Sequence, residues 1–273
     1  MLIDTHAHLT DPEYNADLGV VLKRASTAGV ETVVTIGTDL VDSEKAVAIS
    51  QGCFQVYSCI GVHPNEVLKW DKDSLDVLRK TASSQKVVGI GETGLDYHYS
   101  PTQETIKKQE MVFRDQLRLA KELGLPLMIH TRDAHPETIQ ILKEEKAQEI
   151  SGIIHCYAGD WETAKQYLDL SFLISFGGIV TFGKKAASLQ EVAKKIPLNS
   201  MVLETDCPWL APEPHRGKRN EPAYVTHVAQ KLAELKGLPF EEISNLTSLN
   251  ASRIFKFNDH QKVSEAFKKE AAG

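Results

Sequence analysis

Short apolar runs recur along the chain, and each is followed by a longer stretch in which apolar residues return with helical spacing. The runs are continuous and rich in Val and Ile, as is typical of strands that are buried on both faces of a parallel sheet. The predicted strands are residues 2–5, 32–37, 55–62, 87–91, 126–130, 152–155, 172–176 and 201–205. The pattern therefore predicts a sheet of parallel strands.

Helical spacing lies between these runs, and Gly29, Gly52 and Gly124 stand where left-handed helix caps are expected. The predicted helices are residues 16–28, 43–51, 75–83, 103–123, 137–144, 162–168, 189–196 and 222–236, with a further helix at 239–257. Regular alternation of strand and helix, without a Pro- or Gly-rich linker, predicts an α/β fold: a single-domain (β/α)8 TIM barrel over residues 1–258. Residues 259–273 are predicted to form a charged C-terminal tail.

A doubly wound open sheet is the structural alternative to the barrel. No nucleotide-binding glycine fingerprint follows any of the predicted strands, which disfavours this alternative. In a barrel, the functional site lies at the C-terminal ends of the strands. The residues at those ends are therefore the first place to look for chemistry.

Composition narrows the classes of function. The formal charge of −6 gives no overall basic surface, which argues against a non-specific nucleic-acid binder but allows an enzyme with a locally basic cleft. The four cysteines form no CxxC pair and are expected to be free thiols. The start lacks a basic segment followed by an apolar core, and no run approaches the ~18 apolar residues of a membrane span, so we expect a cytoplasmic protein.

Metal-competent side chains stand where the predicted strands end. His6 and His8 follow the first strand, and their spacing places both imidazoles on one face of an extended chain. Further residues of this kind are His63 after the third strand, Glu92 after the fourth, His130 after the fifth, His155 after the sixth and Asp206 after the eighth. Because strand ends meet at one rim of a barrel, the sequence predicts a metal site there.

The number of these residues exceeds what one tetrahedral ion requires, so two divalent ions are predicted. The expected arrangement is His6, His8 and Asp206 at one ion, His130 and His155 at the other, and Glu92 as the bridge. A carboxylate has two oxygens and can span two ions that lie roughly 3.5–4 Å apart. Mixed imidazole and carboxylate ligands suit Zn, Mn or Fe, whereas Mg normally prefers oxygen, and the sequence leaves the metal open among these.

The order of these motifs resembles the TatD family of metal-dependent deoxyribonucleases, within the amidohydrolase-type metal barrels. The resemblance covers nearly the whole chain. It rests on residues 3–9 (IDTHAHL), 61–64 (GVHP), 89–97 (GIGETGLDY), 126–132 (PLMIHTR), 154–157 (IHCY), 203–208 (LETDCP) and 219–222 (RNEP). It implies hydrolysis of phosphodiester bonds in DNA by metal-activated water, with 3′–5′ exonuclease action on single-stranded or frayed ends and a role in DNA repair or degradation.

Many amidohydrolase barrels bridge two metals with a carbamylated lysine at the end of the fourth strand. Glu92 stands at that position here, and the nearest lysine, Lys86, lies at the other end of the strand. The resemblance therefore implies a glutamate bridge. Two further differences from many relatives, the residue after His130 and the pair Cys156-Tyr157, do not touch a proposed ligand.

Two carboxylates are candidates for the catalytic step. Asp206 can hold one metal and accept the proton of the attacking water. Glu204 lies two residues earlier on the same strand, shares its face and is predicted to assist. The alternative for Glu204 is a structural role, hydrogen-bonded within the barrel.

Several basic residues near the strand ends are candidate substrate contacts. His63 is predicted to contact phosphate, with metal ligation as its alternative. Arg132 can pair in a bidentate manner with a phosphate or with a carboxylate behind the site, or form a plain salt bridge with Asp133 or another acidic neighbour. Arg219 belongs to the basic loop 214–220, which is predicted to face the DNA backbone together with Lys184 and Lys185, with a merely solvated face as the alternative. The aromatic residues Trp209, Tyr97 and Tyr157 are predicted near the same rim, where they either stack on bases or pack.

Two other functions remain open at the level of sequence. A small-molecule amidohydrolase or phosphoesterase would use the same two-metal barrel site, and product analysis would separate it from a nuclease. A non-catalytic binding protein is disfavoured by the intact ligand set. Neither a membrane nor an obligate protein partner is indicated, and the choice between DNA and RNA, the polarity of cleavage and the oligomeric state are not determined by the sequence.

Overall fold

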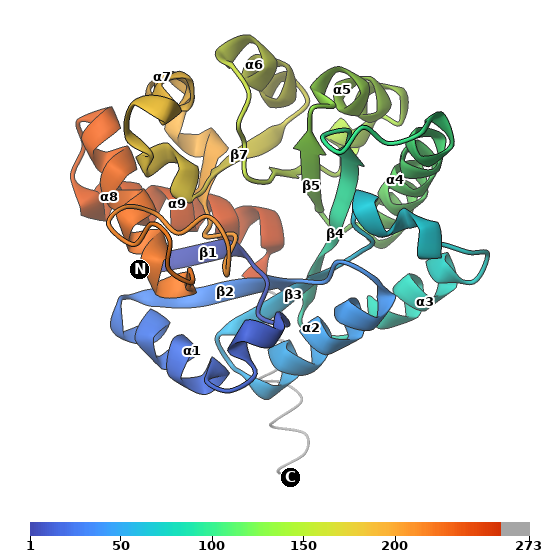
Figure 1. Cartoon of the computed structure of the whole chain (residues 1–273), viewed down its shortest axis with the longest axis horizontal. Coiled ribbons are helices and arrows are strands. Elements are labelled where there is room, and N and C mark those ends of the chain that lie inside the picture. Colours follow the sequence, from blue (N-terminus) through green and yellow to red (C-terminus); the bar gives the residue numbers. More distant parts are fainter. Residues whose placement is uncertain (258–273) are drawn as a thin grey trace.

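The computed structural model describes residues 1–257, and the strands in that part of the chain form one parallel sheet. The strands are β1 (Leu2–Ala7), β2 (Val30–Ile36), β3 (Val56–Ile60), β4 (Val87–Asp96), β5 (Leu127–Arg132), β6 (Gly152–Ile154), β7 (Phe172–Phe176) and β8 (Met201–Leu203). Each strand pairs with the next one along the chain, so their order in the sheet is their order in the sequence. The predicted (β/α)8 barrel is confirmed (Figure 1).

The barrel closes where the chain that follows β8 returns beside β1. Ala7 and Cys207 form a parallel bridge. The amide of Asp206 donates to the carbonyl of His6 over 2.9 Å, and the amide of His8 donates to the carbonyl of Cys207 over 2.8 Å. Side chains from the first and last strands are thereby held at one mouth of the barrel.

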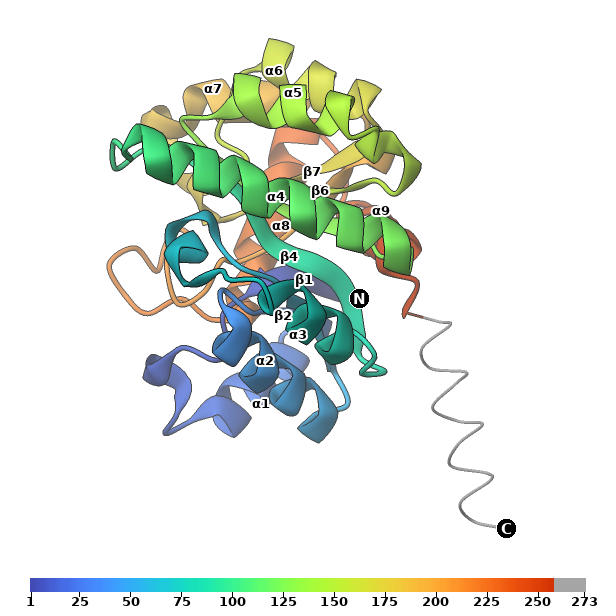
Figure 2. The ribbon, with the colours of Figure 1, turned by 90° about the vertical axis from the view of Figure 1, so that its right-hand side faces the viewer.

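Helices cover the outside of the barrel, in a ring around the strands (Figure 1). They are α1 (Leu18–Thr27), α2 (Leu40–Gly52), α3 (Ser74–Thr81), α4 (Gln103–Leu123), α5 (His135–Glu144), α6 (Trp161–Asp169), α7 (Ala187–Lys195) and α8 (Val225–Lys236). Figure 2 shows α4 along the outer side of β4. The Thr102 side chain caps the start of α4 by accepting the amide of Thr105, and Gly124 ends it with a φ of 65°.

Short 3-10 helices lie in the connections of the described chain. They are η1 (Pro12–Tyr14), η2 (Pro64–Lys69), η3 (Ala147–Glu149), η4 (Gly178–Thr181), η5 (Gly183–Ala186), η6 (Leu198–Ser200) and η7 (Pro222–Tyr224). Hydrophobic periodicity does not reveal such single turns, because they are too short to show a repeat.

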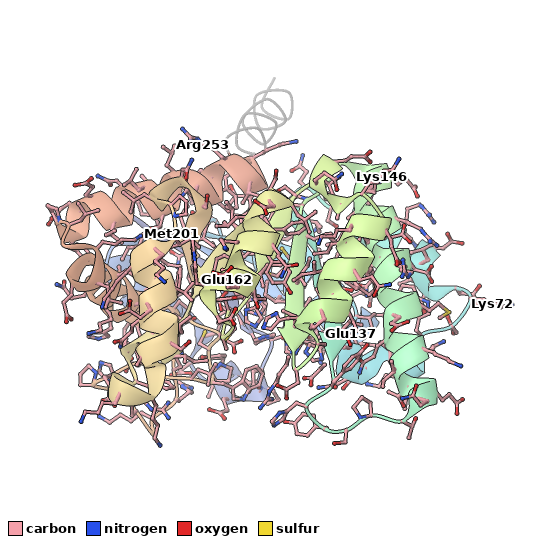
Figure 3. The ribbon with its side chains drawn as sticks, turned by 90° about the horizontal axis from the view of Figure 1, so that it is seen from above. Lys72, Glu137, Lys146, Glu162, Met201 and Arg253 are labelled. Atoms are coloured by element: carbon pink, nitrogen blue, oxygen red, sulfur yellow. The ribbon has the colours of Figure 1, made fainter. Side chains whose placement is uncertain are left out.

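A further helix, α9 (Phe240–Phe255), closes the end of the barrel where the strands begin. Its Ala251 and Phe255, together with Phe257, form an apolar cluster with residues of the strands. The strand residues of this cluster are Ile3, Val34, Ile36, Tyr57, Cys59, Val88, Met128, Ile153 and Val202. Figure 3 shows α9, with Arg253, across one end of the molecule, and Glu137 of the first turn of α5 toward the opposite end.

The structure shifts several predicted boundaries. β4 extends five residues beyond the predicted end at 91, and β5 extends to Arg132. α2 begins at Leu40 rather than at 43, because the Asp39 side chain accepts the amide of Asp42 over 2.8 Å and caps the helix. Gly52 is the last residue of α2 and not a left-handed cap.

Within residues 1–257, the helices are either too short or too polar to cross a membrane. The predicted charged tail, residues 259–273, lies outside the described part of the chain.

Candidate metal centre

The two imidazoles that β1 carries meet at the open mouth of the barrel. Nε2 of His6 and Nε2 of His8 are 3.0 Å apart, and Asp206 Oδ1 lies 3.7 Å and 3.4 Å from them. Behind these side chains, Asp4 accepts hydrogen bonds from the amide of Thr205 over 2.9 Å and from its hydroxyl over 2.6 Å. This clamp holds β1 against the chain that carries Asp206, so the structure brings the first predicted ligand group together.

Glu92 reaches the same space through an irregularity in β4, where the pairing with β5 shifts register. The glycines on either side have positive φ values, 145° at Gly91 and 136° at Gly94. A Cβ at Gly91 would lie 2.3 Å from the carbonyl oxygen of Met128, and one at Gly94 would lie 2.0 Å from that of His130. Only glycine fits this conformation and this close approach, so the two glycines allow β4 to continue while its carboxylate enters the barrel.

The two carboxylate oxygens of Glu92 face two different groups of histidines. Oε2 lies 3.5 Å from Nε2 of His6 and 3.6 Å from Nε2 of His8. Oε1 lies 3.0 Å from Nδ1 of His130 and 3.6 Å from Nε2 of His155. Burial alone would raise the pKa of this carboxyl, but the surrounding histidines hold the pKa well below its usual range. Glu92 is therefore ionised and central to the cluster.

His130 lies between two carboxylates. Its Nδ1 faces Glu92, and its Nε2 lies 3.1 Å from Oδ2 of Asp96. Burial alone would lower the pKa of His130, but the hydrogen bonds with Asp96 and Glu92 outweigh burial and raise it. Gln109 of α4 holds the backbone of Asp96 by accepting its amide over 3.0 Å and donating to its carbonyl over 3.1 Å. Asp96 thus fixes the ring so that Nδ1 points to Glu92.

Glu204 stands behind His155 in the same way. Its Oε1 lies 3.0 Å from Nδ1 of His155 and accepts the amide of Cys156 over 2.7 Å. Nε2 of His155 is left facing Glu92, and it lies 3.9 Å from Oδ1 of Asp206. Burial alone would lower the pKa of His155, but the charges of Glu204 and Asp206 outweigh burial and raise the pKa to about 10. Glu204 is fully buried, so it contacts a ligand-type histidine rather than the open mouth.

His63 approaches Glu92 from the end of β3. Its Nδ1 accepts the amide of Asn65 over 3.1 Å, so the neutral ring carries its proton on Nε2, which lies 3.6 Å from Oε1 of Glu92. Burial lowers the pKa of His63 to about 4, which keeps the ring neutral. Gln116 of α4 fixes the preceding residue, Val62, by accepting its amide and donating to its carbonyl. His63 therefore presents a hydrogen-bond donor at the mouth.

The donor set fits divalent metal ions. Ligand atoms within 4.8 Å of one another come from His6, His8 and Asp206; from His6, Glu92 and His155; from His63, Glu92 and His130; and from His155, Cys156 and Asp206. In residues 1–257, the ion pairs of Glu92 and Asp206 involve imidazoles and neither lysine nor arginine. Buried carboxylates need a compensating cation, and imidazole nitrogens that converge with them are the usual ligands of transition metals.

The comparisons with known proteins agree with this geometry. Residues 3–256 match the family described as TatD related DNase. The chain belongs to this family. It is 45% identical to "Uncharacterized metal-dependent hydrolase YabD" of Bacillus subtilis over 258 residues, which cover 94% of this chain and 100% of the relative. It is 33% identical to "3'-5' ssDNA/RNA exonuclease TatD" of Erwinia amylovora, over 93% of this chain and 99% of the relative.

Solved structures show the same relationship. The crystal structure of YjjV, a TatD homologue from Escherichia coli K12, has a TM-score of 0.87 at 29% identity and covers 93% of this chain and 98% of its own. The phosphotriesterase homology protein of Escherichia coli, at 17% identity and a TM-score of 0.66, shares the fold. The resemblance to the TatD family is confirmed, and the protein is a metal-dependent hydrolase.

In this TatD-family chain, Arg132 lies at the end of β5, with its guanidinium 5.6 Å from the ring centroid of Tyr99. It lines a pocket of about 490 Å³ together with His98, Thr131, Asp133, Ala134, His135, Pro136, Ala158 and Gly159. Asp133 pairs with Nδ1 of His98 over 2.8 Å, so the ion pair considered for Arg132 and Asp133 is taken by another residue. Arg132 is open to the pocket.

Arg219 lies on the outer side of the loop after β8. Its guanidinium donates to both carboxylate oxygens of Asp17, over 3.0 Å and 2.7 Å, and to the carbonyl of Glu13. It also lies 4.9 Å from the ring centroid of Tyr14. Within the described chain these partners all belong to residues 13–17, so the structure places Arg219 against the segment before α1 and apart from the metal ligands.

Several residues that shape this centre are not among those that the sequence pattern predicts. Asp96 lies in the segment 89–97 but beyond the predicted end of the fourth strand, so it was not considered. Asp4 lies before the first histidine of the chain, and its hydrogen-bond partner, Thr205, is near the other end of the barrel sequence, so no local pattern reveals the pair. Gln109 and Gln116 of α4 stand among polar residues in the sequence, and their burial at 0–1% exposure is visible only in the structure.

Proposed function

We propose that this TatD-family enzyme is a deoxyribonuclease that removes nucleotides from the 3′ end of single-stranded or frayed DNA. The observation that carries the proposal is the position of Glu92, with Oε2 toward His6 and His8 and Oε1 toward His130 and His155. A pair of ions bridged by one carboxylate suits in-line displacement at a phosphate. The printed name of the Erwinia relative supports a nucleic acid as substrate and the polarity of cleavage.

Two divalent ions, Mg, Mn or Zn, are the proposed cofactors. His6, His8 and Asp206, whose ligand atoms lie together, would hold one ion. His130 and His155, which both face Oε1 of Glu92, would hold the other, and Glu92 would serve both. When bound, such ions would lower the pKa of a coordinated water toward neutrality and offset the charge on the phosphoryl oxygens. The remaining tasks, which are proton transfer, orientation and contact with the substrate, fall to the side chains of the chain itself.

Asp206 is the proposed proton acceptor. Its side chain is 13% exposed, against 4% for Glu92, and it lies at the mouth beside His6 and His8. A carboxylate in this position can coordinate a metal ion and accept the proton of the attacking water. Glu204 is fully buried against His155, so we assign it to orientation of that ring and not to proton transfer.

Two donors are proposed to contact the scissile phosphate. His63 presents its Nε2–H beside Glu92, because its Nδ1 is occupied by the amide of Asn65. Arg132 faces the pocket next to the mouth, and its planar guanidinium suits a bidentate contact with a phosphate. Arg219 is proposed to hold the loop after β8 in place through Asp17.

The test is the release of nucleotides from end-labelled single-stranded DNA, with EDTA, Mg and Mn arms. We expect release from the 3′ end with either metal, none with EDTA, and none from the variant His155→Ala with any metal. Ser248→Ala is the control, because this hydroxyl donates to the carbonyl of Met1 at the other end of the barrel, where the strands begin. It should retain wild-type release.

The outcome that contradicts the proposal is a metal-loaded protein that leaves DNA intact and hydrolyses amides or simple phosphoesters instead. A labelled 5′ end released first would overturn the polarity alone. Release by His155→Ala at the wild-type rate would overturn the assignment of the site.

A further inference from the structure

Trp209 stands beside the metal centre with half of its surface in water. Its ring centroid lies 4.9 Å from that of His8, with 60° between the ring planes, and 49% of the residue is exposed. By contrast, Trp70 is 7% exposed and packs in the main apolar cluster. Trp209 therefore leaves a large aromatic face open at the mouth, where packing does not use it.

The backbone that carries Trp209 is rigidly held. Its amide donates to the carbonyl of Asp206 over 3.0 Å. The buried side chain of Asn220 donates to the carbonyl of Trp209 over 2.6 Å and to that of Thr205 over 2.8 Å. On the next residue, Leu210, the carbonyl oxygen approaches Gly178 so closely that a Cβ there would lie 2.0 Å away. The open ring is thus pre-positioned relative to a candidate metal ligand, and little conformational entropy is lost when something stacks on it.

Exposed cations lie on the loop that carries Trp209 and on the segment that follows η4. The loop after β8 is tied to η4 by the amide of Glu213, which donates to the Thr181 hydroxyl over 2.9 Å. Arg216 of the same loop also contacts this segment, because its guanidinium lies 3.8 Å from the ring centroid of Phe182, the residue after η4. Three lysines, Lys218 on this loop and Lys184 and Lys185 on η5, are exposed and make no ion pair with other residues of the described chain. Aromatic faces beside solvated cations are the elements from which single-stranded nucleic-acid sites are built.

We propose that Trp209 is a stacking platform for an unpaired nucleobase next to the scissile phosphate. The inference rests on the proposed nuclease function and adds how the substrate class is selected. A base in a duplex has both faces stacked on its neighbours, whereas a terminal or unpaired base has a face free for the indole ring. Because every base has an aromatic face, such a platform selects single strands without selecting a sequence.

The test compares Trp209→Ala with wild type on two matched oligonucleotides, both made non-hydrolysable at the terminal linkage by phosphorothioate substitution. Both are single-stranded: one carries normal bases on its two 3′-terminal nucleotides, and the other has abasic residues at the same positions. Stacking on one base predicts that Trp209→Ala weakens binding of the normal oligonucleotide about 5- to 150-fold. Binding of the abasic oligonucleotide should be the same for both proteins. Trp209→Phe should bind the normal oligonucleotide nearly as wild type does.

Tryptophan fluorescence supplies a second measurement on the loaded enzyme. A base that stacks on Trp209 should quench its emission, and the quenching should vanish in Trp209→Phe. It should persist in Trp161→Phe, because Trp161 begins α6 and packs near Lys195. These variants keep an aromatic side chain, so they remain informative if Trp209→Ala is poorly folded.

The possible failures are distinguishable. Equal weakening on the normal and abasic oligonucleotides would assign Trp209 a structural role and overturn stacking. Wild-type binding by Trp209→Ala in an enzyme that degrades DNA would overturn stacking and leave the nuclease function intact. A wild-type protein that neither binds nor degrades any oligonucleotide would overturn both proposals together.

Discussion

The two ends of the barrel interior use the same strands for opposite purposes. Toward the end where the strands begin, side chains pack into the apolar cluster that α9 closes. Two residues further along the same strands, the side chains are imidazoles and carboxylates. The matched pairs are Met128 and His130 on β5, Ile153 of β6 with His155 directly after it, and Val202 of β8 with Glu204 directly after it. A spacing of two keeps both members of a pair on the same face of the extended chain.

The contrast shows that stability and chemistry are assigned to different ends of one barrel. The apolar end stabilises the fold by burying hydrocarbon side chains. The polar end buries polar groups, and each of these lowers the stability of the folded state unless it has a hydrogen-bond or ion-pair partner. Several of them lack a hydrogen-bond partner in the described chain: Nδ1 of His6, Nδ1 of His8, Oγ of Ser175 and Oε2 of Glu204. Substitutions at the polar end should therefore change activity more than stability, and substitutions at the apolar end should do the reverse.

The largest effect is expected for Glu92→Gln at the polar end. Loss of the carboxylate that we propose as the bridge should lower hydrolysis by about 10³-fold or more, since a bound metal contributes several kcal/mol of transition-state stabilisation. The unfolding midpoint of the metal-free protein should change little, because no apolar contact is lost. Metal content, hydrolysis rate and denaturant unfolding of the EDTA-treated protein check the three parts. A metal-replete variant with wild-type rates would refute the bridge.

Met128→Ala tests the apolar end. Met128 is fully buried in the cluster that α9 closes, and removal of its side chain should lower the free energy of unfolding by about 2–5 kcal/mol. The rate of hydrolysis per folded molecule should stay near that of wild type, because the backbone of β5 still carries His130. Urea unfolding and active-site-normalised rates measure the two quantities. A fall in rate that exceeds the fall in stability would show that the two ends are not independent.

A smaller effect is expected for Asp96→Asn, which acts on a ligand through its orientation. Loss of the carboxylate that faces Nε2 of His130 should weaken metal binding about 10- to 100-fold, as measured by calorimetric titration with Mn. High metal concentration should restore part of the activity. Asp133→Asn is the control, because Asp133 makes a similar pair with His98 at the surface. Equal metal affinity in both variants would contradict an orienting role for Asp96.

The alternation of strands and helices could be predicted from the sequence because short apolar runs mark the strands, and apolar residues recur with helical spacing between them. Candidate ligands such as His6 and His155 were recognisable because they follow these runs, and a barrel gathers strand ends at one rim. The end of β4 was placed too early, since the apolar run stops at 91, whereas Gly91 and Gly94 allow the strand to continue to Asp96.

What lies behind the ligands could not be predicted. The approach of Glu204 to His155 depends on how β6 and the chain after β8 are placed across the barrel, and no local pattern records that distance. The basic loop predicts a substrate contact for Arg219, whereas its ion pair with Asp17, which is distant in sequence, is visible only in the structure. Side-chain partners of this kind are set by tertiary packing, whereas periodicity reports only which face of an element is buried.

The smallest effect is expected for Ser175→Ala, which tests the cost of a single buried hydroxyl at the polar end. The Ser175 hydroxyl is buried on β7 without a hydrogen-bond partner in the described chain, which costs free energy in the folded state. Its removal should raise the free energy of unfolding by about 1 kcal/mol, with little change in hydrolysis. Ser43→Ala is the control: its hydroxyl donates to the carbonyl of Gly61 and accepts that residue's amide, so the same substitution should be destabilising. If both variants lose stability equally, the Ser175 hydroxyl has a hydrogen-bond partner in solution. The buried polar groups at this end then make more hydrogen bonds than the side-chain contacts of the structure indicate.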